Sequence, residues 1–90
     1  MLFEWDELKR QGNIEKHGFD FVDAPLLFSK PHMTGRTRDG QDGEERWIAT
    51  GILRDRYATA VYTMRGETIR LISIRSARRD ERQRHQALFG

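Results

Sequence analysis

Hydrophobic and polar positions change their spacing several times along the chain, and each spacing predicts a different element. Residues 2–5 alternate and are rich in aromatic side chains, which predicts a short strand. Asp6 can cap a helix expected over about residues 7–16, whose apolar face is weak, and Gly18 can end it. A second short helix is expected after its N-cap, Asp20. Four residues there have the spacing of one buried face: Phe21, Ala24, Leu27 and Phe28.

The segment from Ser29 to Gly43 shows no sustained periodicity. Because proline, glycines and scattered charges interrupt it, this segment is expected to be a loop. A connection of this length is unusual in so small a domain, which favours a flexible or functional loop.

Three strands are predicted next, over residues 46–53, 57–64 and 67–75, which are rich in β-branched and aromatic side chains. The short connections between them imply an antiparallel meander. From Ala77 the pattern becomes helical again, with Ser76 as the expected N-cap. The whole chain therefore predicts one α+β domain in the order strand, helix, helix, three strands, helix, with the helices covering one face of an antiparallel sheet.

Composition narrows the classes of protein that fit. A chain of 90 residues and 10.6 kDa has room for one domain with a small core. The absence of cysteine excludes disulfides, thiolate zinc sites and cysteine nucleophiles, and it fits a reducing compartment. No apolar run approaches the roughly 20 residues of a spanning helix, and the N-terminus has acids where a signal peptide has bases. We therefore expect a cytoplasmic protein.

The charges are unevenly placed although the net charge is only +2. Residues 1–43 hold 6 basic and 8 acidic side chains, a balance of −2, whereas residues 44–90 hold 10 basic and 6 acidic side chains, a balance of +4. Thirteen of the 16 basic residues are arginines. The rigid fork of arginine suits bidentate binding of phosphate or carboxylate, so the C-terminal half indicates RNA, DNA or an acidic protein as a partner. The alternative is an ordinary solvated surface.

Seven arginines gather on the last predicted hairpin and helix: Arg65, Arg70, Arg75, Arg78, Arg79, Arg82 and Arg84. A helix with so little apolar surface is either a solvated face or a surface that a partner covers. Tyr57 and Tyr62 lie near enough in sequence to stack on unpaired bases, although both are also ordinary strand residues.

The three histidines do not have metal-ligand spacing. His17 lies at the predicted end of the first helix, where the helix dipole favours a protonated ring, so it is a candidate acid or base as well as a simple helix-ending cation. His32 falls in the predicted loop, and His85 lies one turn after Glu81, where the two could pair on a solvent face. No phosphate-binding loop or dinucleotide fingerprint is present. An enzyme with this sequence is expected to use neither a metal nor a cofactor.

Motifs spread along the chain resemble one family of small toxins. They are Phe3-Glu4-Trp5-Asp6, Lys9, Asn13, Lys16-His17-Gly18, Phe21, Gly43-Glu44-Glu45-Arg46, Gly51, Val61-Tyr62-Thr63, Arg65-Gly66 and Ile69-Arg70 through Ile72-Ser73. In this order they resemble the BrnT-type ribonuclease toxins of type II toxin–antitoxin systems. The sequence departs from that pattern at Ile74, at Arg78, where a small hydroxyl residue is usual, and at His85, where a tyrosine is common.

The resemblance implies a RelE-like fold, a BrnA-like antitoxin with a ribbon-helix-helix DNA-binding domain, and complexes of two toxins with two antitoxins. It also implies cleavage of messenger RNA by attack of a 2′-hydroxyl on its own phosphate. Such an enzyme must move protons and stabilise negative charge. On this basis the expected catalytic residues are His17 or Glu45 as proton carriers, with four cations as charge stabilisers: Lys16, Arg65, Arg70 and Arg75. The expected RNA-binding residues are Arg46, Arg78, Arg79, Arg82 and His85.

Two alternatives remain open at this point. Glu45 and Arg46 are adjacent and could form a structural ion pair at the start of a strand rather than serve catalysis. The same arginines would also suit a non-catalytic module that docks an acidic protein or nucleic acid and cleaves nothing.

Overall fold

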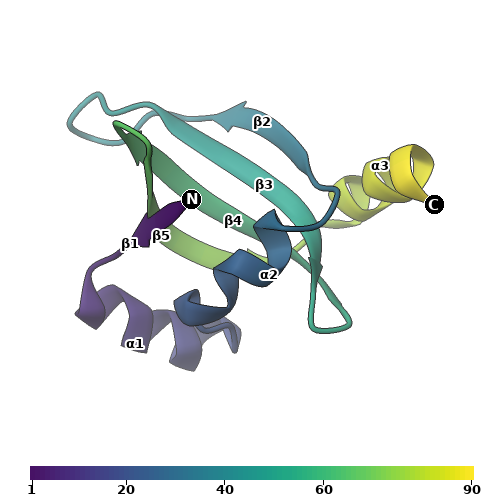
Figure 1. The fold of residues 1–90 in the computed structure, drawn as a ribbon, viewed down its shortest axis with the longest axis horizontal. Coiled ribbons are helices and arrows are strands. Elements are labelled where there is room, and N and C mark those ends of the chain that lie inside the picture. Colours follow the sequence, from purple (N-terminus) through teal and green to yellow (C-terminus); the bar gives the residue numbers. More distant parts are fainter.

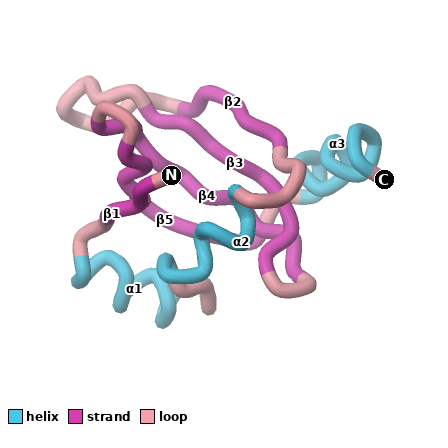
Figure 2. The backbone as a smooth tube through the Cα atoms, in the orientation of Figure 1, coloured by secondary structure: helices cyan, strands magenta, loops and turns pink.

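A computed structural model describes residues 1–90 as one mixed sheet with helices on both of its faces (Figures 1 and 2). The elements in chain order are β1 (Leu2–Glu4), α1 (Glu7–His17), a 3₁₀ turn (Phe21–Asp23), α2 (Ala24–Phe28), β2 (Met33–Thr37), β3 (Arg46–Leu53), β4 (Arg56–Arg65), β5 (Thr68–Ser76) and α3 (Arg79–Phe89). None of the helices is long and apolar enough to cross a membrane.

The five strands lie in the order β1-β5-β4-β3-β2. The predicted meander of β3, β4 and β5 is confirmed, with antiparallel pairing throughout. The expectation of a purely antiparallel sheet is wrong, because β1 pairs with β5 in parallel. Parallel neighbours need a long crossover, and here the helices and the other strands provide it between β1 and β5.

The prediction of a loop over residues 29–43 is wrong for its middle part, which forms β2 at the edge of the sheet. β2 pairs antiparallel with β3, placing Gly35 opposite Ile48 and Arg36 opposite Trp47. Its sequence, MTGRT, has no apolar alternation because an edge strand contributes little to the core. Backbone pairing with β3, rather than local sequence, therefore decides its conformation.

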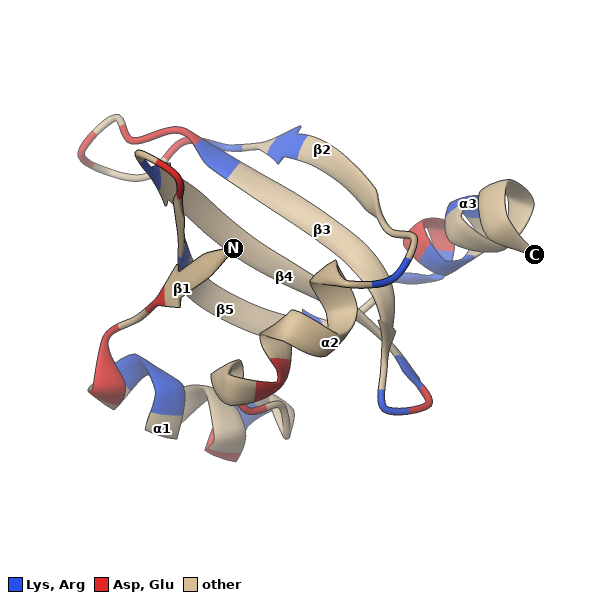
Figure 3. Ribbon diagram, in the orientation of Figure 1, with Lys and Arg blue, Asp and Glu red and all other residues tan.

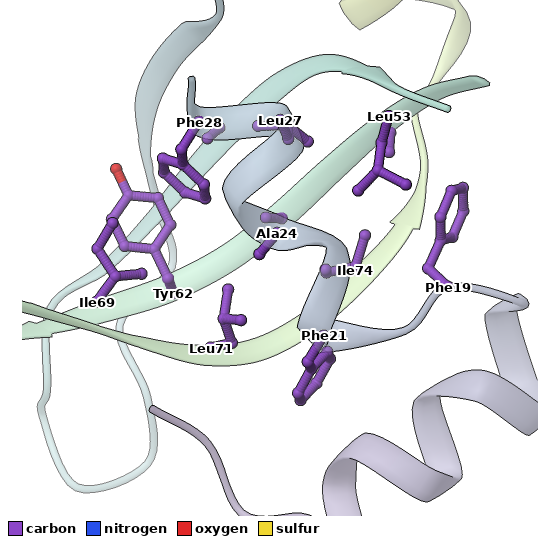
Figure 4. Packing of buried hydrophobic residues seen from close by; sticks show 13 residues of the cluster. Phe19, Phe21, Ala24, Leu27, Phe28, Leu53, Tyr62, Ile69, Leu71 and Ile74 are labelled. Carbon is purple, nitrogen blue, oxygen red and sulfur yellow. The ribbon is translucent and has the colours of Figure 1, made fainter. Parts of the chain in front are cut away.

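The core lies between α2 and one face of the sheet, where buried residues of the short helix meet those of β3, β4 and β5 (Figure 4). The cluster comprises Phe19, Phe21, Ala24, Leu27, Phe28, Ala49, Leu53, Ala58, Ala60, Tyr62, Ile69, Leu71 and Ile74. The predicted buried face of the second helix is thus confirmed. Small residues on β3 and β4 allow α2 to lie close to the sheet.

Helix α1 is held by its caps and by one buried side chain. The Asp6 carboxylate accepts hydrogen bonds from the N–H groups of the first turn, and Gly18 ends the helix in the left-handed conformation. Asn13 is buried, donates to the carbonyls of Phe19 and Ile74 at 2.8 and 3.0 Å, and accepts from the Ile74 N–H at 3.0 Å. The two bonds to Ile74 fix α1 against β5, and the third holds the chain just after the helix.

Helix α3 packs on the opposite face of the sheet from α2, so the expectation that the helices cover one face is wrong. Ala58 and Ala60 of β4 point to the core, whereas Thr59 between them contacts Glu81 of α3. Ser76 is not the N-cap, because β5 continues to it and α3 begins only after Arg78.

Two glycines give a paired test of the packing between α2 and β3. A Cβ at Gly51 would lie 3.3 Å from Cβ of His32 and 3.4 Å from Cγ of Leu27, whereas a Cβ at Gly12 would meet nothing within 4 Å. We expect Gly51→Ala to lower the free energy of unfolding by about 1–2 kcal/mol. Gly12→Ala, in the interior of α1, should raise it by about 0.5–1 kcal/mol. Urea denaturation measures both, and a stabilised Gly51→Ala variant would contradict the packing described.

Candidate functional site

The sheet face that carries α3 is open at the end remote from that helix, and a polar groove of about 540 Å³ lies there. We call it the arginine groove. It is lined by Lys9, Gln41, Asp42, Glu44, Arg46, Thr63, Arg65, Arg70, Leu71 and Ile72. Residues from α1, three strands and the loop before β3 therefore meet at one place.

Strand register brings the arginines of the groove together. Thr63 of β4 pairs with Arg70 of β5, and Arg65 follows two positions later on the same face of β4. Arg46 stands at the first position of β3, at the end of the loop that joins β2 to β3. The acidic residues of this loop are red in Figure 3. Ile72 has no partner on β4, because Val61 pairs with Ser73 and Tyr62 with Leu71. This bulge reverses the alternation of β5 beyond Ile72, so that Ile74 faces the core as Leu71 does.

Carboxylates orient these arginines but accept hydrogen bonds from only some of their N–H groups. Arg70 Nη1 lies 2.8 Å from Glu4 Oε2, and Arg65 Nε lies 4.0 Å from the same oxygen. Arg46 donates to Glu44 through long bonds of 3.4 Å. A guanidinium has five N–H donors, so each arginine retains groups that can bind an anion. Lys9 enters no ion pair, and the lining holds four cations against two carboxylates.

Arg75, a predicted charge stabiliser, lies outside the groove and is bound by α3. Its Nη1 and Nη2 donate to the two oxygens of Glu81 at 2.8 and 3.0 Å, and the Thr59 hydroxyl and the Arg78 N–H also donate to Glu81. Burial alone raises the pKa of Glu81, but these hydrogen bonds outweigh it and lower that pKa from 4.5 to about 2. Arg75 and Glu81 therefore form a structural ion pair that joins α3 to the sheet.

The predicted RNA-binding residues on α3 divide into two groups. Arg78, Arg79 and Arg82 are exposed and have no carboxylate partner, so they form a free cationic surface beside the sheet. His85 is buried instead, with its Nε2 at 3.3 Å from the Pro31 carbonyl and its ring against aromatic neighbours. The suggestion that His85 pairs with an acid on a solvent face is wrong, because that position faces the protein.

The structure does not bring Lys16 and His17 to the groove. They end α1 beside Gly18, whose carbonyl accepts from Arg56 at the first position of β4, whereas Arg65 is the last residue of that strand. A strand of 10 residues spans roughly 30 Å. Lys16 is exposed and His17 is half-buried at that distant end.

Glu45 lies at the rim of the groove rather than in its lining, with its side chain 63% exposed. Its carboxylate is 3.9 Å from Arg36, while its main-chain carbonyl accepts from the Thr63 hydroxyl at 2.7 Å. The suggested structural pair between Glu45 and Arg46 is wrong, because Arg46 contacts Glu44 instead.

Sequence reasoning overlooked Lys9, Glu44 and Thr63 as site residues, although all three stand within the motifs that carry the family resemblance. Lys9 is separated from the arginines by more than 30 residues of chain, so only the fold shows that they share a groove. No three His, Asp or Glu side chains converge as a possible metal-ligand set.

Comparison with known proteins identifies related sequences and structures. The family model described as "ribonuclease toxin, BrnT, of type II toxin-antitoxin system" matches residues 5–81. The chain is also similar to the crystal structure of the Brucella abortus ribonuclease toxin BrnT, with 31% sequence identity and a TM-score of 0.63 over 88% of this chain and 100% of that chain. A search of curated proteins gave no match.

Proposed function

Because the chain belongs to the BrnT family of ribonuclease toxins of type II toxin–antitoxin systems, we propose that it cleaves messenger RNA at the arginine groove and needs no metal ion to do so. The observation that carries this proposal is the convergence of Lys9, Arg46, Arg65 and Arg70 on one open groove. A groove with an excess of cations suits a phosphate of single-stranded RNA.

In this mechanism the substrate supplies the nucleophile. The ribose 2′-oxygen attacks the adjacent phosphorus, the bond from phosphorus to the 5′-oxygen breaks, and the products are a 2′,3′-cyclic phosphate and a free 5′-hydroxyl. The arginines stabilise the extra negative charge of the phosphorane. Glu44, a carboxylate in the groove lining, accepts the 2′-hydroxyl proton, and the Lys9 ammonium protonates the leaving oxygen.

The proposal also includes a partner and a place of action. Membership of the family supports a BrnA-like antitoxin with a ribbon-helix-helix domain, two copies of which would bind two toxins and bring them to operator DNA. Cleavage of messenger RNA in the cytoplasm would inhibit translation until the antitoxin neutralises the toxin. The RelE-like relationship expected for this family accords with a small sheet that is flanked by helices.

Incubation of the purified protein with single-stranded RNA in EDTA tests this function. We expect cleavage to continue in EDTA and to yield 2′,3′-cyclic phosphate ends, whereas DNA of the same sequence should stay intact because it lacks the nucleophile. Loss of cleavage in EDTA would overturn the metal-free mechanism. RNA that is bound but never cut would favour the alternative, a non-catalytic basic module.

A further inference from the structure

A second, smaller hollow adjoins the arginine groove and has a different chemistry. We call it the rim pocket. Its volume is about 280 Å³, and its lining residues are Glu44, Glu45, Trp47, Thr63, Met64 and Arg65. Glu44, Thr63 and Arg65 line the arginine groove as well. A ligand whose anionic group lies in the groove can therefore place a neighbouring group in the rim pocket.

The rim pocket offers apolar surface that the core does not use. The Met64 side chain at the end of β4 is 44% exposed, and Trp47 is only partly buried. The Arg36 guanidinium covers the Trp47 ring, 5.2 Å from its centroid, and keeps the indole in place. A volume near the lower limit of about 300 Å³ for small-molecule pockets suits one flat ring system rather than a larger ligand.

Glu45 supplies the carboxylate of this pocket that is free to accept hydrogen bonds. Arg36 donates to Asp39 at 2.6 Å but stays 3.9 Å from Glu45. The other acid, Glu44, lies 3.4 Å from Arg46 and has the part of proton acceptor in the proposed mechanism. The Thr63 hydroxyl donates to the main-chain carbonyl of Glu45 at 2.7 Å, so the backbone that carries this acid is fixed at the pocket while its exposed side chain can turn toward a ligand.

We propose that the rim pocket binds a guanine base next to the phosphate that the arginine groove holds, with Glu45 as the specificity-determining residue. This inference rests on the proposed function. Guanine presents two adjacent donors, N1–H and N2–H, to which a carboxylate can bind through both oxygens, whereas uracil, cytosine and adenine offer a single donor next to acceptors. The exposed thioether of Met64 contacts the face of the base.

Binding to an uncleavable RNA tests the pocket separately from catalysis. The probe is a short oligouridine, 2′-O-methylated throughout, that carries one guanosine, inosine or adenosine. Inosine lacks the N2 amino group, so the protein should bind the guanosine form about tenfold more tightly than the inosine form. Glu45→Gln should abolish this difference in affinity. The side-chain amide of glutamine has an N–H₂ group in place of one carboxylate oxygen, and this group cannot accept a hydrogen bond from the guanine N2–H. Glu15→Gln, an exposed acid on α1 without an ion pair, is the matched control and should keep it.

Mapping of cut sites on unmodified RNA gives the second readout. We expect cuts to concentrate beside guanosine, and the ratio of kcat/KM for guanosine to that for adenosine should fall toward one in Glu45→Gln. Equal binding of the guanosine and inosine probes by the unaltered protein would overturn the inference. A Glu45→Gln variant that cuts every site more slowly with the ratio intact would also overturn it, since that result indicates a proton carrier. Failure to cut any RNA would contradict the proposed function alone. The difference in affinity between the guanosine and inosine probes can still be measured in that case, because this assay does not depend on cleavage.

Discussion

Replacing Glu81 with alanine should lower the free energy of unfolding by about 3–5 kcal/mol, the range for removing one partner of a buried ion pair. The Glu81 side chain is 4% exposed, and its carboxylate accepts from Arg75, Thr59 and the N–H of Arg78. The variant leaves the Arg75 guanidinium partly buried without a counter-charge and removes the cap of α3. Denaturation in urea, followed by far-ultraviolet circular dichroism, measures the loss.

The exposed pair on the same helix provides the control. Arg84 and Asp80 lie 3.1 Å apart with side chains that are 64% and 69% exposed. Exposed ion pairs of this type contribute less than about 1 kcal/mol, so Arg84→Ala should change stability little. Equal losses in Glu81→Ala and Arg84→Ala would show that the buried pair does not hold α3 to the sheet.

The same carboxylate makes stability depend on pH in the acid range. The pKa of Glu81 is about 2 in the folded protein against 4.5 for an ordinary glutamate. A lowered folded pKa contributes stability that is fully present above the unfolded value and is lost as pH falls through the folded one. This shift corresponds to about 3 kcal/mol. The difference in stability between the unaltered protein and Glu81→Gln should therefore shrink between about pH 5 and pH 2. A constant difference would exclude Glu81 as its source.

Local sequence patterns were sufficient to predict the centre of the sheet. Residues of β3, β4 and β5 alternate and are joined by short turns, so their pairing partners are neighbours in the chain. β2 could not be predicted in this way, because Gly35 and Arg36 carry no strand pattern and gain their conformation from β3. The parallel pairing of β1 with β5 likewise depends on contacts between residues more than 60 positions apart.

The sequence was enough to predict which type of residue forms the candidate site, but not which individual residues belong to it. The excess of arginine pointed to an anion, and Arg46, Arg65 and Arg70 do share a groove. That Arg75 is already neutralised could not be predicted, because Arg75 lies on β5 and Glu81 on α3, and the period of neither element relates the two residues. Lys16 and His17 lie on the same helix as Lys9, but they are at its C-terminal end, whereas Lys9 is near its start and lines the groove.

Arg70→Ala should reduce RNA cleavage about 10²–10³-fold, the usual cost of removing one preorganised group that stabilises a developing charge. Arg70 lines the arginine groove, where Glu4 holds its Nη1 at 2.8 Å and Thr63 flanks it on β4. Most of the loss should appear in kcat, because the phosphorane carries more charge than the bound substrate. Single-turnover cleavage of a short RNA with excess protein measures it.

Two further variants distinguish the stabilisation of the phosphorane by Arg70 from a general electrostatic attraction between the protein and RNA. Arg70→Lys keeps the positive charge but loses the bidentate fork, so it should recover only part of the activity. Arg79→Ala removes an exposed cation of α3, outside the groove, and should weaken binding modestly while reducing the salt dependence of affinity. If Arg79→Ala lost as much cleavage as Arg70→Ala, with Arg70→Lys fully active, catalysis would depend on the total charge of the surface. The arginine groove would then have no special part in the chemistry. A positioned donor predicts that both variants at Arg70 lose more cleavage activity than Arg79→Ala, whereas a diffuse positive field predicts that Arg70→Lys is the most active of the three.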